Sequence, residues 1–269
     1  MHTPVNQFKA RLGEGPAQIG LWAALTDTVC VEITAGAGFD WLCLDGEHSP
    51  HELRTLLAAL QTLAAYPVQP IVRVPVGDPA IIKRVLDIGA QTVVVPMVET
   101  ADQARRLVEA MRYPPNGIRG VGTSLARAAR WNRAVDYFAR ADAEMCLIVQ
   151  IESARGLEHL EDIAAVDGVD ALFIGPSDLA ASLGHLGNPA HPDVQQAIHA
   201  AIRRTIAAGK PCGSLSADEA TARDYLNRGC RFIAVGSDAG LFANATRQLA
   251  RKFTTTGADA TAPPRGQVY

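Results

Sequence analysis

Two carboxylates, Glu152 and Asp178, each follow a short apolar segment and stand 26 residues apart. This spacing is about one strand–helix repeat, so both side chains are expected at the ends of neighbouring parallel strands, facing a common point. Two carboxylates repel each other unless a cation lies between them. Oxygen ligands without a nearby Cys or His pair favour Mg²⁺, Mn²⁺ or Co²⁺ over structural zinc. The alternative is that both residues cap the helices that follow them, and the spacing leaves both interpretations open.

Two further side chains have types suited to moving protons and holding anions. His48 follows Asp45 by three residues, which suggests a carboxylate that fixes the imidazole tautomer and leaves the other ring nitrogen to move a proton. A lone histidine in a loop is otherwise usually just exposed. Arg73 ends an apolar segment, where an unpaired guanidinium is costly to bury. It needs an anion, either a protein carboxylate or the carboxylate or oxyanion of a substrate.

Other chemistries are disfavoured by the motifs. A Schiff-base mechanism needs a desolvated lysine in the pocket, and no lysine stands at the C-terminal end of a predicted strand. The segment Gly36-Ala37-Gly38 lacks the third glycine of a dinucleotide fingerprint, and the sequence has neither a Walker A nor a GxSxG motif. The four lysines are Lys9, Lys83, Lys210 and Lys252.

Short segments rich in Val and Ile alternate with amphipathic stretches, which is typical of repeated strand–helix units around a parallel sheet. Eight units in about 250 residues predict a single-domain α/β protein with a (β/α)8 (TIM) barrel fold, and an open doubly wound sheet is the alternative. The predicted strands are 18–25, 41–44, 70–74, 92–98, 146–151, 171–174, 211–215 and 232–235. The predicted helices are 51–64, 79–88, 101–112, 157–166, 193–208, 218–228 and 239–252.

Length and composition narrow the class of protein. The chain has 269 residues, 48% of them hydrophobic, which is enough for a large buried core. A net charge of -3 gives no reason to expect nucleic acid or an anionic membrane as a partner. No apolar run approaches the roughly 18 residues that span a bilayer, and the first residues lack the pattern of a signal peptide. We therefore expect a soluble, cytoplasmic protein.

Two segments depart from the repeat. Residues 113–133 are too long and too rich in Gly and Arg for an ordinary connection, which suggests a functional loop over one barrel end. Residues 254–269 have few groups to bury, which predicts a mobile C-terminal tail after a barrel domain that spans 1–253.

Several motifs together resemble one family. The chain is similar to the HpcH/HpaI family of metal-dependent, class II 2-oxo-acid aldolases, in order over roughly residues 6–253. The segments that carry the likeness are GFDWLCLDGEHSP (38–50), VRVP (72–75), PMVETADQA (96–104), YPPNGIRGVG (113–122), ARAARW (126–131), QIES (150–153) and VDALFIGPSDLAASLG (169–184).

The resemblance implies an activity and an assembly. The implied reaction is the reversible cleavage of a 4-hydroxy-2-oxo acid to pyruvate and an aldehyde. The implied fold is a (β/α)8 barrel, usually hexameric, with the last helix packed against a neighbouring subunit. In such an assembly Asp87 is implied to reach the base of an adjacent subunit.

The resemblance also assigns roles to the polar residues. Glu152 and Asp178 match the ligands of a divalent cation, Mg²⁺, Mn²⁺ or Co²⁺, which stabilises the enolate of pyruvate. His48 matches the base and Asp45 its support, and Arg73 matches the residue beside the pyruvyl oxygens.

Five more residues are expected to contact the substrate. Gln150, Gly175 and the backbone of Ser177 match the cradle for pyruvate. Trp22 and Leu215 match the walls of the aldehyde pocket, and the alternative is that both are barrel core.

Two other functions are open. A CoA-thioester lyase of the citrate-lyase type is built on a related barrel, and its CoA phosphates would need a basic groove, for which the arginines of 113–133 are the candidates. A catalytically silent barrel would have lost one of Glu152, Asp178, His48 or Arg73, and this chain retains all four.

Overall fold

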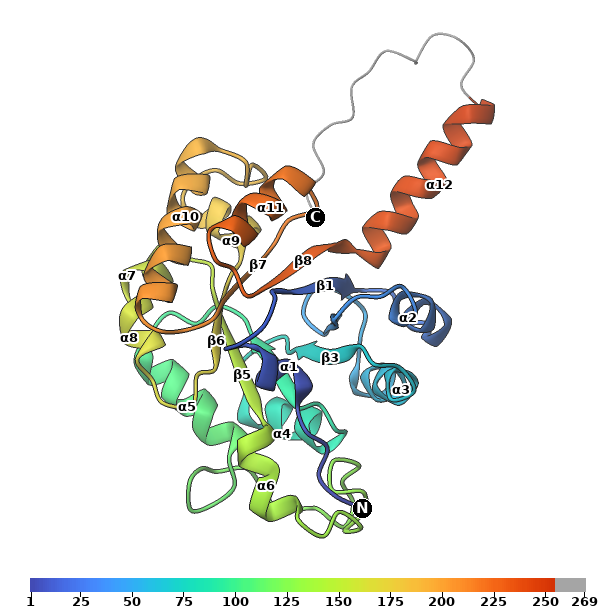
Figure 1. Cartoon of the computed structure of the whole chain (residues 1–269), viewed down its shortest axis with the longest axis vertical. Coiled ribbons are helices and arrows are strands. Elements are labelled where there is room, and N and C mark those ends of the chain that lie inside the picture. Colours follow the sequence, from blue (N-terminus) through green and yellow to red (C-terminus); the bar gives the residue numbers. More distant parts are fainter. Residues whose placement is uncertain (255–269) are drawn as a thin grey trace.

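The computed structural model describes residues 1–254, so all of the predicted tail except Thr254 lies outside the described residues. Eight parallel strands close into a barrel in sequence order, which confirms the predicted (β/α)8 fold (Figure 1). The strands are β1 (Gln18–Ala23), β2 (Trp41–Asp45), β3 (Gln69–Arg73), β4 (Thr92–Val95), β5 (Cys146–Ile151), β6 (Ala171–Ile174), β7 (Cys212–Leu215) and β8 (Phe232–Ser237).

Helices surround this barrel (Figure 1). They are α1 (Gln7–Arg11), α2 (Thr28–Ala35), α3 (Leu53–Leu63), α4 (Pro79–Asp87), α5 (Ala101–Met111), α6 (Tyr137–Glu144), α7 (Ala154–Glu158), α8 (Leu160–Ala164), α9 (Pro176–Ser182), α10 (Pro192–Ala207), α11 (Glu219–Asn227) and α12 (Asp238–Thr254). The sequence did not predict α2, because the β-branched residues of TVCVEITA favour a strand as much as a helix. The helix predicted over 157–166 is divided between α7 and α8, which meet at His159.

Aromatic side chains fill the inside of the barrel. Trp41 and Phe232 pack edge to face inside it, with ring centroids 6.1 Å apart. Phe8 of α1 is fully buried and packs edge to face on Phe232, with centroids 5.4 Å apart. Because α1 precedes β1, this contact lies toward the N-terminal ends of the strands. The C-terminal ends are left for a cavity, as is usual in barrels of this kind.

The strand register brings polar residues to those C-terminal ends. Asp45 pairs with Arg73 across β2 and β3. Ile151 pairs with Ile174 across β5 and β6, so that Glu152, the next residue after β5, reaches the same rim. Residues far apart in sequence therefore meet at one end of the barrel.

The long segment 113–133 lies at the other end. Arg127 donates to the carbonyl of Ile88 at 2.9 Å, and the N–H of Ala128 donates to the carbonyl of Asp87 at 3.0 Å. Both carbonyls stand at the end of α4, just before β4 begins. The segment thus covers the N-terminal end of the barrel. Its arginines, the candidates for the CoA groove of the alternative function, do not line the cavity at the C-terminal end within one chain.

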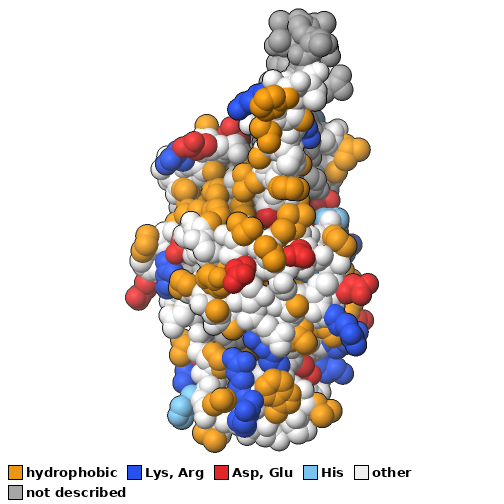
Figure 2. Space-filling model, turned by 90° about the vertical axis from the view of Figure 1, so that its right-hand side faces the viewer, with side chains coloured by type: hydrophobic (Ala, Val, Ile, Leu, Met, Phe, Trp, Pro, Cys, Tyr) orange, Lys and Arg blue, Asp and Glu red, His pale blue; other side chains and the backbone are white. Residues whose placement is uncertain are grey.

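Helix α12 stands away from the barrel (Figure 1). Four of its large apolar side chains are exposed, and Figure 2 shows apolar side chains along the projecting part of the molecule. These four are Leu241, Phe242, Leu249 and Phe253. Among the described residues, no helix is long and apolar enough to cross a membrane.

We predict that Gly20→Ala destabilises the barrel by about 1–3 kcal/mol through overpacking. A Cβ at this position of β1 would overlap the buried ring of Trp41, which is only 1% exposed. Urea unfolding followed by circular dichroism measures the loss. Gly13→Ala is the matched control, because no atom lies within 4 Å of the Cβ that it adds. Equal stability of the two variants would contradict this account of the barrel core.

Candidate active site

A cavity of about 630 Å³ opens at the C-terminal ends of the strands. Ten of the predicted site residues line it, although they come from six different strands and the segments that follow them. They are Trp22, Asp45, His48, Arg73, Gln150, Glu152, Gly175, Ser177, Asp178 and Leu215. The structure thus brings these residues together, while their chemical roles stay predictions.

Arg73 is held by two carboxylates at the edge of this cavity. Its Nε and Nη2 donate to the two carboxylate oxygens of Asp45 at 2.8 and 2.7 Å, and its Nη1 lies 2.9 Å from Oε2 of Glu47. The guanidinium also lies 5.1 Å from the centroid of the Trp22 ring. Of the anions that the sequence left open for Arg73, the protein carboxylate is therefore present, and the cavity leaves room for a substrate anion as well.

Asp45 is occupied by this pair rather than by the ring of His48. Its Oδ1 accepts from the backbone N–H groups of Glu47 at 3.0 Å and His48 at 3.3 Å. Burial tends to raise the pKa of Asp45, but the hydrogen bonds and charge of Arg73 outweigh burial, so this pKa lies below its ordinary value. The prediction that Asp45 orients the imidazole is not supported, because the guanidinium and the turn take its oxygens. The carboxylate that faces the ring is Glu47, with Oε1 3.8 Å from Nε2.

Glu47 is the functional candidate that the sequence reasoning missed. Burial, which outweighs the attraction of Arg73, and the nearby charges of Asp45 and Asp178 raise the pKa of Glu47 to about 7. The available signal was its place between Asp45 and His48, at the end of a buried strand.

Glu152 is buried, with 3% of its surface exposed, and its carboxylate is fixed from two sides. Oε1 accepts from the backbone N–H of Met97 at 2.8 Å, and Oε2 accepts from Nε2 of Gln150 at 2.6 Å. Met97 adopts a left-handed φ of 53°, a strained conformation that tends to occur at functional sites. Gly175 is required here because a Cβ would overlap the carboxylate of Glu152.

The capping alternative for the carboxylate pair does not hold. Ser153, not Glu152, caps α7, and its hydroxyl accepts from the N–H of Gly156. Gly175 occupies the N-cap position of α9, and Asp178 lies in the first turn without a capping hydrogen bond. Burial and the charges of Asp178 and Glu47 raise the pKa of Glu152 to about 7, against the hydrogen bond from Met97. A partly buried set of oxygen donors with this much negative charge fits a hard divalent cation.

Two of the remaining cavity residues have features that bear on their roles. The Oε1 atom of Gln150 is buried and has no hydrogen-bond partner among residues 1–254, so a hydroxyl or water would satisfy it. Trp22 is mostly buried and packs on Phe173, with centroids 5.4 Å apart, while part of it lines the cavity. Trp22 is thus both barrel core and cavity wall.

Asp87 is the one predicted site residue that lies elsewhere. It ends α4 and accepts from Nη2 of the buried Arg119 at 2.9 Å, at the N-terminal end of the barrel. The contact of Asp87 with the base of an adjacent subunit stays a prediction.

We predict that Asp45→Asn lowers the free energy of unfolding at pH 7 by about 3 kcal/mol, because the buried guanidinium of Arg73 loses its bidentate partner. The pKa of Asp45 is lowered in the folded state, so its contribution is present above the ordinary value of 3.8 and is lost as the pH falls further. Denaturant titrations at pH 7 and below pH 4 should show the difference from wild type shrinking in acid.

Glu161→Gln is the control for this variant, since it removes an ion pair with Arg204 on an exposed face. Its effect should be much smaller, as for other exposed pairs. An Asp45→Asn effect no larger than that of Glu161→Gln would contradict the buried ion pair.

Comparison with known proteins gives the chain a family. The family model described as HpcH/HpaI aldolase/citrate lyase matches residues 18–245. The chain is 58% identical over 253 residues to the hydroxypyruvate/pyruvate aldolase of Pseudomonas aeruginosa, covering 94% of each protein. It is 52% identical over 261 residues to the 4-hydroxy-2-oxo-heptane-1,7-dioate aldolase of Shigella sonnei, covering 97% of this chain and 98% of that protein.

A solved structure agrees with these sequences. The crystal structure of an HpcH/HpaI aldolase/citrate lyase family protein from Burkholderia cenocepacia matches with a TM-score of 0.89 and 43% identity, covering 93% of this chain and all of that one. The cavity with its carboxylate pair, the closed barrel and these matches along nearly the whole sequence have one explanation: the chain belongs to the HpcH/HpaI aldolase/citrate lyase family.

Proposed function

We propose that this chain is a class II aldolase that reversibly cleaves a 4-hydroxy-2-oxo acid into pyruvate and an aldehyde. The observation that carries the proposal is the pair Glu152 and Asp178, which faces one cavity together with Arg73 and His48. The names of the relatives support it, since they are aldolases of pyruvate, hydroxypyruvate or a 4-hydroxy-2-oxo acid. We place this activity in the cytoplasm.

Glu152 and Asp178 are the residues that would hold the cation, Mg²⁺, Mn²⁺ or Co²⁺. Bound there, it would supply a Lewis acid that stabilises negative charge on the substrate. Hydrogen bonds from Met97 and Gln150 fix the carboxylate of Glu152, so the ligand is oriented before the substrate arrives.

The other cavity residues perform the bond cleavage. His48 takes the proton of the C4 hydroxyl, the C4 oxygen forms a carbonyl, and the electrons of the C3–C4 bond pass to the pyruvyl part as an enolate. Arg73, fixed by Asp45, places positive charge beside the developing oxyanion. Protonation of the enolate at C3 gives pyruvate. Oε1 of Gln150, which has no hydrogen-bond partner within residues 1–254, is suited to accept from the C4 hydroxyl or from water.

The remaining cavity residues are assigned to substrate binding by where they lie in the cavity. Gly175 and the backbone of Ser177 complete the cradle for pyruvate at the start of α9. Trp22 and Leu215 form apolar walls on the side where the aldehyde would lie. Such walls select among aldehydes by roughly 1–3 kcal/mol per methylene, without touching the pyruvyl group.

We further propose that α12 packs against a neighbouring subunit in a homo-oligomer, a hexamer by family resemblance. Its exposed apolar side chains, such as Phe242 and Leu249, support the idea, since apolar surface of this kind marks an interface. In such an assembly Asp87, which Arg119 holds at the N-terminal end of the barrel, would approach a neighbour's base.

The citrate-lyase type of reaction on a CoA thioester is less well supported. Its phosphates would need several basic side chains at the mouth of the cavity, where, among the described residues, Arg247 is the one lining arginine besides the paired Arg73. Arg119 and Arg127, from the candidate basic segment, bond instead to Asp87 and to the carbonyl of Ile88 at the opposite end of the barrel.

Removal of divalent cations tests the proposal. Exhaustive chelation should abolish aldol addition of pyruvate to a panel of aldehydes, and Mg²⁺, Mn²⁺ or Co²⁺ should restore it, because both ligands are carboxylates. Borohydride with pyruvate should leave the protein mass unchanged. Full activity without cations, or a pyruvyl–lysine adduct, would contradict the class II assignment.

Replacement of His48 tests the assignment of the base. His48→Ala should lower kcat by roughly 10²- to 10⁴-fold, the usual loss for a general base, and should leave cation affinity nearly unchanged. His159→Ala is the control, a half-buried histidine outside the cavity whose ring is hydrogen-bonded to the carbonyl of Arg155. An unchanged kcat in His48→Ala would make His48 a merely exposed loop residue.

A further inference from the structure

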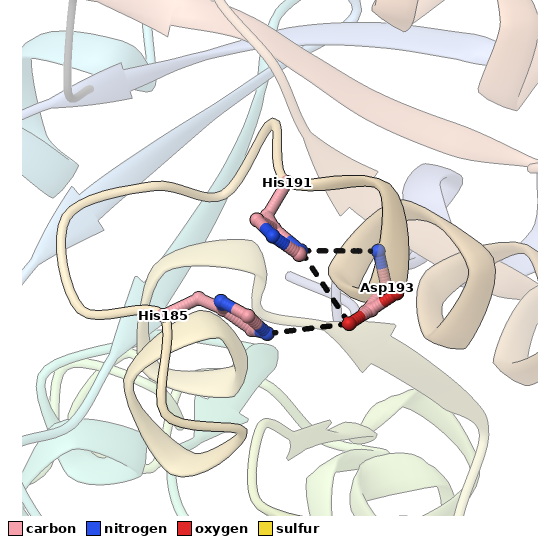
Figure 3. A group of neighbouring side chains, drawn as sticks. All are labelled: His185, His191 and Asp193. Atoms are coloured by element: carbon pink, nitrogen blue, oxygen red, sulfur yellow. Dashed lines mark hydrogen bonds and ion pairs between the residues drawn. The ribbon is translucent and has the colours of Figure 1, made fainter.

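A second set of metal-ligand side chains lies outside the cavity, in the connection from α9 to α10. His185, His191 and Asp193 each offer one ligand atom, and these atoms all lie within 4.8 Å of one another (Figure 3). Within residues 1–254, no other group of three or more His, Cys, Asp or Glu side chains comes so close. None of the three lines the candidate active site.

Two of the distances among the three donors are close to those between ligands of one ion. Nε2 of His185 lies 3.6 Å and Nδ1 of His191 lies 3.7 Å from the same oxygen, Oδ2 of Asp193. Both distances are too long for good hydrogen bonds. Bonds of about 2.0–2.2 Å to a tetrahedral Zn²⁺ place its ligand atoms about 3.3–3.6 Å apart. The two distances to Asp193 are close to this range. Because an ion lies in the plane of the imidazole that binds it and the two ring planes are nearly parallel, one ring must turn before both nitrogens face a shared cation.

The backbone holds these side chains in place without the ion. The N–H of His185 donates to the carbonyl of Ala180 at 2.8 Å, and the N–H of His191 donates to the carbonyl of Asn188 at 3.1 Å. Pro192 then starts α10 directly after His191. The two imidazole rings stack with centroids 3.6 Å apart and planes 16° apart.

Helix capping accounts for only part of this arrangement. Nδ1 of His191 accepts from the N–H of Asp193 at 3.2 Å, which caps α10. The ring of His185, however, makes no hydrogen bond among the described residues, although it lies against His191 and Asp193. Cation binding through Nε2 of His191 keeps the cap, and binding through Nδ1 replaces it with a stronger bond.

The chemistry of the donors selects the metal. Imidazole nitrogen suits Zn²⁺ and related transition metals, whereas Mg²⁺ prefers oxygen ligands. Asp193 is largely exposed, with 72% of its side-chain surface accessible, so water is available for the fourth position of a tetrahedral ion.

From these observations we infer that His185, His191 and Asp193 form a structural binding site for Zn²⁺ or a similar transition metal. The ion fastens the end of α9 to the start of α10. Since α9 carries Ser177 and Asp178 in its first turn, the ion also steadies the cavity wall. The site does not depend on the aldolase proposal, because it shares no ligand with the cavity.

Isothermal titration with Zn²⁺ tests the site directly. The protein should be untagged, stripped with a chelator, and carry Glu152→Gln and Asp178→Asn so that the cavity pair cannot bind the metal. We expect one Zn²⁺ per chain and no binding of Mg²⁺ at this site. A third substitution in this background, His185→Ala, removes one of the proposed ligands. It should weaken the Zn²⁺ affinity by roughly tenfold or more. Asp193→Asn should weaken it as well, and this exposed substitution leaves the fold intact.

The matched control is His2→Ala in the same background. His2 is an exposed histidine 3.1 Å from a single carboxylate, Asp136, without a second imidazole. Its replacement should leave the Zn²⁺ affinity unchanged. Saturating Zn²⁺ should also raise the melting temperature of the background protein by about 5 °C, and of the His185→Ala protein by much less.

Two outcomes would overturn the inference. One is that the background protein takes up no Zn²⁺. The other is that His185→Ala and Asp193→Asn bind it as tightly as the background protein. Failure of wild-type aldolase activity would instead contradict the proposed function and leave this site standing, because uptake of Zn²⁺ is measured without any substrate.

Discussion

The crowding of negative charge at the C-terminal mouth of the barrel is the constraint on which the rest of the site depends. Asp45 and Glu47 hold the guanidinium of Arg73, while Glu152 and Asp178 face the same cavity. Burial and mutual repulsion raise the pKa of Glu47 and of Glu152 to about 7. Only a proton or a cation relieves this repulsion, so the site is built to be completed by a positive charge.

The register of the barrel strands brings these charged side chains together. Parallel pairing of β2 with β3 sets Asp45 opposite Arg73, and pairing of β5 with β6 sets Glu152 beside Gly175, where the missing side chain leaves room for the carboxylate. The aromatic side chains below, with Trp22 in contact with Phe173, make the floor of the cavity rigid. The side chains that stabilise the barrel and those proposed to react with the substrate thus lie at different levels along the barrel axis, as is common in this fold.

The sequence predicted those parts that follow from periodicity. All eight strands were found, and Glu152 and Asp178 converge because each follows a strand and the two lie about one strand–helix repeat apart. Which side chain pairs with which within the site could not be predicted from periodicity. A spacing of three residues suggested that Asp45 serves His48, but Arg73, 28 residues away, takes the carboxylate through strand pairing. Likewise, nothing in the composition of 113–133 tells which barrel end it covers, since that depends on its contacts with α4.

The connection between β6 and α10 links the two proposed cation sites. It begins with Gly175 and Asp178 in the cavity and ends with His191 at the start of α10, and its middle is tied back to α9 by the bond from His185 to Ala180. A short helix such as α9 has little intrinsic stability, so its orientation depends on what holds its two ends. Strand β6 fixes one end. The chemistry of the donors explains why a different metal would suit the other end: carboxylates at the cavity choose a hard ion that exchanges ligands with a substrate, whereas imidazoles choose one that holds the backbone in place.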